Sequence, residues 1–167
     1  MLKSQDLFVL LKILALETDD WRYLDLARSL FMSTSEVHAS VKRCHESRLL
    51  DLRKKLPRKE VLLEFLIHGA PYAYPVQRGG LTRGMPTSFA APPLSELVEH
   101  QLAIPPVWRF AEGAMTGYEV TPLHRSAPKA ALLDTKFYEL LTLVDALREG
   151  RARERQFARL ELETRIA

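Results

Sequence analysis

The sequence predicts a mainly α-helical protein with a Pro-rich α+β segment in its middle. Apolar residues recur at spacings of three and four in the first 68 residues and again after residue 129, which is the period of amphipathic helices. Between these parts, residues 71–128 hold nine of the ten prolines and five of the seven glycines. Long helices are therefore excluded there, except around 95–102. We expect three segments, at 1–68, 69–128 and 129–167.

The first expected helix includes the apolar run Leu7 to Leu16, with Ser4 as its cap. Lys12 interrupts this run, and no small-residue cleavage site follows it, so the pattern differs from that of a signal peptide. We expect an amphipathic helix that packs its leucines on the two helices after it.

Two short helices are expected between Leu24 and Leu50, joined by a tight turn at Phe31 and Met32. Ser33 and Glu36 have the S-x-x-E spacing of a capping box, so the second helix should begin at Thr34 and continue to about Ser47. The two apolar stripes should face each other, because their residues have helical spacing: Leu26, Ala27 and Leu30 on the first helix, and Val37, Val41 and Cys44 on the second.

These residues resemble the helix-turn-helix of bacterial transcription regulators, particularly the winged-helix type of the MarR-like group. The resemblance covers about residues 3 to 50, and its pattern consists of Leu26-Ala27, Leu30, Met32-Ser33, Val37, Val41 and Leu49-Leu50. It implies a winged-helix fold that places the second helix in the major groove of double-stranded DNA. Phe31 and Arg48 stand where such proteins often have glycine, so we expect the local backbone to differ there.

The outer face of the second helix supplies the candidate DNA-binding residues. Its first turns would approach the bases, so the candidates for direct readout are Ser35, His38, Ala39 and Lys42. Ser33, Thr34 and the free amides beside them would suit a phosphate. The residues expected to contact the DNA backbone are Arg43, Arg53, Lys54 and Lys55. The alternative is an ordinary solvated helix pair.

The stretch from Lys42 to Lys59 concentrates positive charge. It contains eight basic residues against two acidic ones, a net charge of +6, whereas the whole chain carries only +3. Such a concentration is typical of phosphate binding. Because Asp51 to Lys55 is too short for a full β-wing, we expect a truncated wing or a plain basic loop. A solvated, Lys-rich connector is the alternative.

The middle segment is rich in aromatic and aliphatic residues, so it is not a simple flexible linker. A further helix is expected at 61–68 before it, and short extended pieces are expected at 72–74, 106–110 and 118–123. So long an irregular stretch usually forms a partner surface or a ligand pocket. The Gly-rich run 78–84 is interpreted as a surface turn, with a phosphate-holding loop as the alternative.

Two helices are expected at the C-terminal end. The first has a strong apolar stripe, with Asp134 as its N-cap, made of Leu133, Phe137, Leu140, Leu141, Val144 and Leu147. The second, Arg151 to Ile166, is highly charged and has a thin stripe of Ala152, Phe157 and Leu160, which can extend to Ile166. We expect it to dock on a second subunit and to form a homodimer, with a frayed tail as the alternative.

No catalytic constellation is visible, so we expect a protein that is not an enzyme and carries no cofactor. His38, Cys44 and His45 lack the convergent ligand set that a metal requires. Cys44 is the only cysteine, which excludes an intramolecular disulfide and fits a cytoplasmic setting. We expect it to be an inert buried thiol, with a redox switch as the alternative. No stretch is long enough for a membrane span.

Together these features favour a sequence-specific, DNA-binding transcription regulator that acts as a dimer on operator DNA. The alternative is a protein-interaction module, such as an antitoxin or defence-system subunit, in which the helix-turn-helix is a scaffold. In that case residues 72–128 would bind the protein partner, mainly through the aromatic stretch Tyr72 to Trp108.

Overall fold

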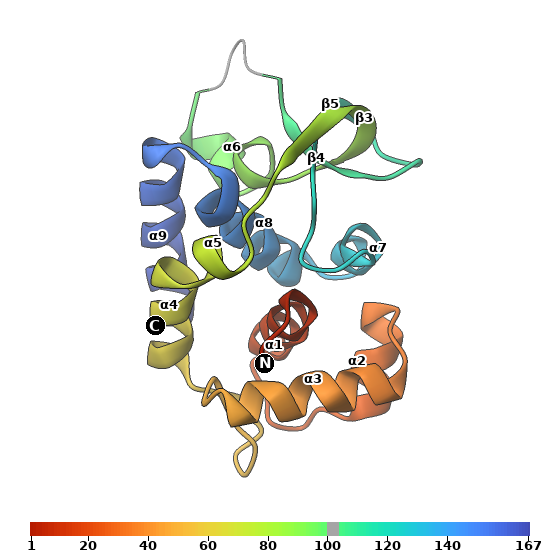
Figure 1. Cartoon of the computed structure of the whole chain (residues 1–167), viewed down its shortest axis with the longest axis vertical. Coiled ribbons are helices and arrows are strands. Elements are labelled where there is room, and N and C mark those ends of the chain that lie inside the picture. Colours follow the sequence, from red (N-terminus) through yellow and green to blue (C-terminus); the bar gives the residue numbers. More distant parts are fainter. Residues whose placement is uncertain (100–103) are drawn as a thin grey trace. The chain divides into compact units, whose positions relative to one another are not determined.

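The computed structural model describes residues 1–99 and 104–167. It is mainly helical, with 56% helix, 14% strand and a small sheet, which confirms the expected class (Figure 1). The helix expected around 95–102 lies partly outside the described residues. Within them, helix α6 spans only Leu94–Leu97.

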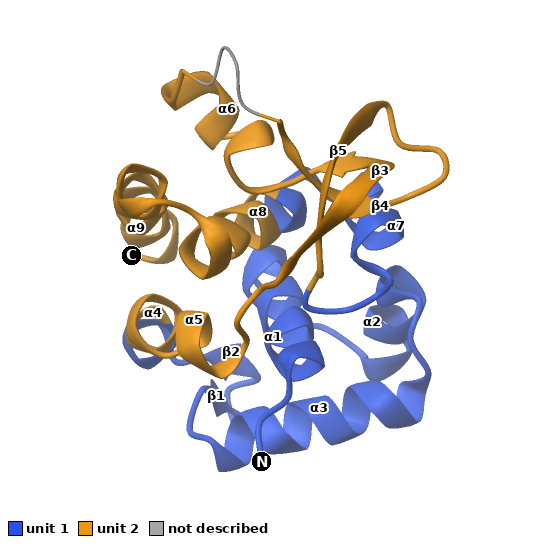
Figure 2. Cartoon of the chain, turned by 45° about the horizontal axis from the view of Figure 1, so that its top comes forward, with its two compact units in different colours: residues 1–62, 123–138 blue, residues 63–122, 139–167 orange. Residues whose placement is uncertain are grey.

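The chain forms two compact units (Figure 2). Unit 1 contains residues 1–62 and 123–138, and unit 2 contains residues 63–122 and 139–167. Each unit combines stretches that are separated in the sequence but pack together. The units therefore divide the chain differently from the three predicted segments. We call residues 123–138, which rejoin unit 1, the return segment.

Helix α1, Ser4–Leu16, is the centre of unit 1. Every residue from Asp6 to Ala15 is buried, on all sides of the helix and not along one stripe. One side packs on the next two helices, and Phe8 contacts the rings of His124 and Phe137 from the return segment. Ser4 is not the cap: the Asp6 carboxylate accepts a hydrogen bond from the Lys3 amide at 2.7 Å.

Helices α2, Tyr23–Leu30, and α3, Thr34–Glu46, form the expected pair. All six predicted inner residues are buried, and the capping box is confirmed by hydrogen bonds of 3.1 and 2.9 Å between Ser33 and Glu36. Phe31 and Arg48 have φ of 54° and 63°. The two residues therefore adopt the left-handed conformation that usually favours glycine.

A short hairpin follows α3. Strands β1, Leu50–Asp51, and β2, Leu56–Pro57, pair antiparallel around a turn at residues 52–55. The Asp51 carboxylate accepts hydrogen bonds from the amides of Arg53 and Lys54, which fixes the turn. A truncated wing or a plain basic loop was expected here, and the structure has a hairpin with two paired residues on each strand.

The return segment contains helix α7, Ala127–Leu132, and the first residues of α8, Thr135–Glu149. Asp134 accepts a hydrogen bond from the Phe137 amide at 3.1 Å, as an N-cap should. Its second oxygen lies 2.7 Å from Lys12 Nζ of α1. Leu133 was wrongly included in the apolar stripe, because it precedes the helix and is 65% exposed.

Unit 2 is built around a small closed sheet of three strands, β3, Arg78–Pro86, β4, Pro106–Arg109, and β5, Met115–Val120. Strand β3 pairs antiparallel with both others, and β4 pairs parallel with β5. The strand expected at 106–110 is confirmed. The surface turn expected at 78–84 is wrong, because these residues belong to β3 and pair with β5.

Short helices flank the sheet in sequence. They are α4, Lys59–His68, α5, Ala70–Ala73, and the 3₁₀ turn η1, Ser88–Ala90. The extended piece expected at 72–74 is wrong for its first two residues, since Tyr72 and Ala73 end α5. The last turn of α5 is completed by a hydrogen bond from the Tyr74 amide to the Ala70 carbonyl, at 2.9 Å.

The last helix, α9, Ala152–Ile166, buries a stripe that shares only Ile166 with the predicted one. Its buried residues recur every four positions, at Glu154, Ala158, Leu162 and Ile166. Ala152 and Leu160 are exposed, and the Arg153 guanidinium lies 5.9 Å from the ring of Phe157. The helix thus already has a buried apolar face, and its packing gives no separate reason for docking on a second subunit.

Candidate nucleic-acid interface

The face of α3 opposite its buried stripe is exposed and polar. Thr34 and Ser35 are exposed, and Ala39 is half-buried. Lys42 has a side chain that is 77% exposed and lies 3.9 Å from the Glu46 carboxylate. An exposed ion pair at this distance contributes little, so the Lys42 ammonium remains available to another anion. This face offers hydroxyl groups, a methyl group and one cation.

His38 is held at the edge of this face by stacking. Its ring lies 3.6 Å from the ring of Tyr23 at an interplanar angle of 15°. Tyr23 in turn meets Trp21 edge-on, at 5.3 Å. The plane of the imidazole is therefore fixed, while the residue stays exposed. A hydrogen-bonding group held in this way is suited to directional contacts.

The beginning of α3 is occupied by its own cap. Ser33 Oγ accepts from the Glu36 amide, and the Glu36 carboxylate accepts from the Ser33 amide. These hydrogen bonds with Ser33, assisted by His124 and Arg125 nearby, lower the pKa of Glu36. The carboxylate is therefore ionised, so the first turn already holds a negative charge. Ser33 is occupied by this cap, whereas Thr34 and Ser35 are exposed and take no part in it.

Arg43 has a structural partner. Its guanidinium forms two hydrogen bonds of 2.8 Å with the buried carboxylate of Asp6, and its side chain is only 20% exposed. The pairing connects α3 to α1 and neutralises both charges inside unit 1. We therefore leave Arg43 out of the proposed contact surface, although its sequence position placed it there.

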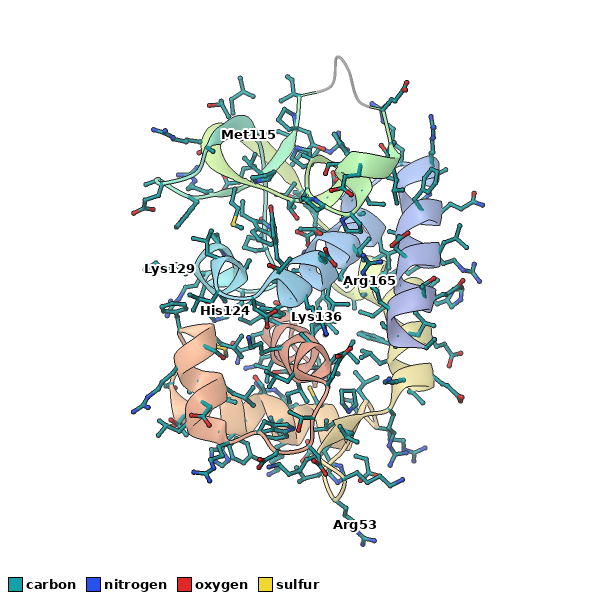
Figure 3. All side chains as sticks on the ribbon, turned by 180° about the vertical axis from the view of Figure 1, so that it is seen from behind. Arg53, Met115, His124, Lys129, Lys136 and Arg165 are labelled. Atoms are coloured by element: carbon teal, nitrogen blue, oxygen red, sulfur yellow. The ribbon has the colours of Figure 1, made fainter. Side chains whose placement is uncertain are left out.

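The hairpin divides its basic residues between two roles. Lys55 Nζ donates to the Trp21 carbonyl and lies 4.5 Å from the centre of the Trp21 ring. The Trp21 indole donates a hydrogen bond to the Lys55 carbonyl at 2.8 Å. Lys55 therefore stabilises the fold and is not free to contact DNA. The side chains of Arg53 and Lys54 are exposed and have no ion pair among the described residues. Figure 3 shows Arg53 projecting from the hairpin tip.

Comparisons with family models, with curated proteins and with solved structures find no match. The surface is therefore characterised by its own residues: an exposed face of α3, a stacked histidine and a basic hairpin tip. Of the predicted contact residues, those whose side chains are exposed or half-buried and have no ion pair or side-chain hydrogen bond with residues 1–99 or 104–167 are Thr34, Ser35, Ala39, Arg53 and Lys54.

The sequence-based prediction missed two cations next to this surface. Arg125 and Lys129 are exposed on the return segment, and Lys129 Nζ lies 5.9 Å from the ring of Phe31 in the α2–α3 turn. They lie about ninety positions further along the chain, and no local pattern connects them with α3. Only the tertiary fold brings them there.

Cys44 lies behind this surface. Its thiol is buried and donates to the Asp6 carbonyl at 3.4 Å, and burial raises its pKa. A protonated, buried thiol is a poor nucleophile and a poor metal ligand. In the described part of the chain, no three His, Cys, Asp or Glu side chains gather as a metal site would require. No helix there is long and apolar enough to cross a membrane.

The aromatic stretch of unit 2 is only partly accessible. Trp108 is 1% exposed, and its indole donates to the buried Asp145 carboxylate at 2.7 Å, so it belongs to the core. Tyr72 is 80% exposed and borders an open groove of about 600 Å³ with Ile67, Leu160 and Arg155. A partner could contact this groove but not Trp108.

Proposed function

We propose that unit 1 binds double-stranded DNA through α3 and the hairpin at residues 51–55, as a sequence-specific transcription regulator. The observation that carries this proposal is an exposed face of α3 on a helix whose orientation is fixed by two contacts with other helices. These are the stacking of His38 on Tyr23 of α2 and the ion pair between Arg43 and Asp6 of α1, while the capping box at Ser33 sets where the helix begins. A helix that reads bases must be rigidly held, because displacement by a fraction of a hydrogen-bond length loses the contact.

The chemistry of the exposed face fits the major groove. The groove is about 12 Å wide and admits one helix. Ser35 and His38 offer hydrogen bonds, the Ala39 methyl suits a thymine methyl, and Lys42 suits guanine oxygen or nitrogen. The hairpin serves as a truncated wing, in which Arg53 and Lys54 contact phosphates and set the register of α3.

The proposed regulator acts as a homodimer of the MarR-like, winged-helix kind. One α3 reads only a few base pairs, so two copies related by two-fold symmetry gain affinity and specificity from a pseudo-palindromic operator. Occupancy of that operator would block or recruit the transcription machinery. The sign of regulation depends on where the operator lies.

A second candidate function is a protein-interaction module of the antitoxin or defence-subunit kind. It is favoured by one observation, the groove beside exposed Tyr72, whose lining mixes apolar residues with the charged residues Arg155, Arg159 and Glu163. The two functions differ in salt dependence. Contacts with a row of phosphates weaken steeply with salt, whereas a mixed protein contact with few ion pairs depends on salt much less.

The experiment that tests the proposed function replaces Ser35, His38 and Lys42 together with alanine. We expect specific operator affinity to fall at least about 100-fold, because three base contacts are lost and each good one contributes about 1–3 kcal/mol. The matched control is Thr135→Ala with Lys136→Ala, two exposed positions elsewhere in unit 1. If the triple variant folds and binds operator as tightly as the control does, α3 is not the recognition helix.

A further inference from the structure

The return segment is fastened beside the α2–α3 turn. Ser126 Oγ donates to the Leu30 carbonyl at 2.6 Å, and α7 packs on α2. His124 stacks on Phe8 of α1 with ring centres 5.2 Å apart. Because a backbone carbonyl and a buried ring hold it, the segment keeps its side chains at a fixed place relative to α3.

Two cations of this segment are not neutralised. Arg125 is exposed and forms no ion pair or hydrogen bond with residues 1–99 or 104–167. Lys129 is exposed, and its ammonium lies over the face of the Phe31 ring, which is itself half-exposed. A cation above an aromatic face keeps its charge and its hydrogen-bond donors, so both groups can take an anion.

These cations and the hairpin flank α3 at its two ends. Lys129 lies by the turn that leads into the first residue of α3, whereas the hairpin follows the last turn. Figures 2 and 3 agree that the hairpin and α7 lie at opposite ends of unit 1. The 13 residues of α3 span about 20 Å, at about 1.5 Å per residue.

This spacing matches the borders of a major groove. A helix of about 20 Å that lies across a groove about 12 Å wide reaches past the phosphates on both sides. Cations at one end of the helix then meet one strand, and cations at the other end meet the opposite strand. The hairpin alone would contact only one side.

We propose that Arg125 and Lys129 form a second phosphate-binding arm, which contacts the DNA strand opposite to the one contacted by Arg53 and Lys54. The inference rests on the proposed DNA-binding function and adds a contact that the N-terminal 68 residues do not contain. The proximity of Arg125 to Glu36 supports it: besides the hydrogen bonds from Ser33, the arginine helps to lower the pKa of that carboxyl and offsets its repulsion of phosphate.

The test measures the salt dependence of binding to a duplex that carries the sequence upstream of the gene and to a scrambled duplex. For Arg125→Ala with Lys129→Ala, the slope of log K against log salt should fall by about two phosphate contacts on both duplexes, at about 0.9 per contact. The control, Lys136→Ala with Arg159→Ala, removes the same charge at positions paired with Glu17 and Glu163. It should leave the slope unchanged.

The variant Arg125→Lys with Lys129→Arg keeps both charges and should keep the slope, which separates loss of charge from loss of folding. An unchanged slope in the double-alanine variant, with wild-type binding intact, would overturn the second arm and leave the proposed function standing. If the wild-type protein binds neither duplex, the proposed function fails, and the arm fails with it. If the double-alanine variant and the charge control lose the same amount of slope, the loss reflects the change in net charge. That result would also overturn the proposed second arm.

Discussion

Arg43 and Asp6 are joined by two hydrogen bonds of 2.8 Å, from the guanidinium Nε and terminal nitrogen to the two carboxylate oxygens. Asp6 is completely buried, and Lys3 donates its amide to the same carboxylate. The pair fixes the rotation of α3 on α1. It therefore determines which residues of α3 face outward, although neither partner needs to contact DNA.

Removing Arg43 should destabilise the protein strongly. Arg43→Ala leaves the buried Asp6 carboxylate without its cation, which we expect to lower the free energy of unfolding by about 3 kcal/mol. Lys42→Ala, at the neighbouring exposed position, should change it by less than about 0.5 kcal/mol. Urea denaturation of both variants measures the difference. Equal midpoints would show that the ion pair does not hold α3 in place.

The Arg48→Gly variant should be more stable than the Arg48→Ala variant. Its φ of 63° lies in the left-handed region, where a side chain costs about 1 kcal/mol relative to glycine. We expect Arg48→Gly to exceed Arg48→Ala in free energy of unfolding by about that amount. Because both variants remove the same charge, the comparison isolates the backbone. Indistinguishable denaturation curves would contradict the left-handed geometry at this residue.

Asp134 should contribute stability that is lost in acid. Burial alone would raise the pKa of Asp134, but hydrogen bonds from Lys12 and from the Phe137 amide hold it below the ordinary value of 3.8. A carboxyl whose pKa is lower in the folded state stabilises above its unfolded pKa, and this stability disappears as the pH falls through the folded value. We expect Asp134→Asn to cost about 2 kcal/mol at pH 7, because it leaves Lys12 without an anion.

This cost should begin to shrink below about pH 4, where the Asp134 carboxyl of the unfolded chain takes up its proton, and should shrink further as the pH falls through the lower folded-state pKa. Thermal unfolding of both proteins between pH 7 and pH 3 measures the change. Glu17→Gln is a matched control, since its partner Lys136 lies in an exposed pair and should matter little. A cost for Asp134→Asn that stays constant down to pH 3 would refute the ionised pair.

Gly117 should not tolerate a side chain. A Cβ there would lie 1.9 Å from the Pro105 carbonyl oxygen, which already accepts a hydrogen bond from the Tyr118 amide. We expect Gly117→Ala to cost about 3 kcal/mol, because backbone must move to admit the methyl group. At Gly80 nothing lies within 4 Å of the added atom, so Gly80→Ala should be nearly neutral. Similar melting temperatures for the two variants would rule out the close strand packing.

Local signals predicted the candidate interface well at the level of secondary structure. Ser33 and Glu36 fixed the beginning of α3, because a capping box is formed within four residues. The inner stripes of α2 and α3 followed from helical periodicity, and the short spacing after Asp51 indicated that a full wing would not fit, which left a truncated wing or a basic loop. Each of these features depends on neighbours in the sequence.

Features set by distant contacts were not predictable in this way. Arg43 and Lys55 are basic and were expected to be exposed, but Asp6 and Trp21 hold them against unit 1. The return segment gave no local sign that it would pack beside α2. The run 78–84 is glycine-rich, yet its backbone pairs along β5, because small residues let strands approach closely.

The most direct test of DNA binding is a titration of the purified full chain into a labelled duplex carrying the sequence upstream of its gene. A scrambled duplex of equal length serves as competitor, and salt is varied from about 50 to 200 mM. We predict specific binding that exceeds scrambled binding at least tenfold and weakens steeply with salt. Equal, weak binding to both duplexes would contradict the account and would favour the protein-interaction function instead.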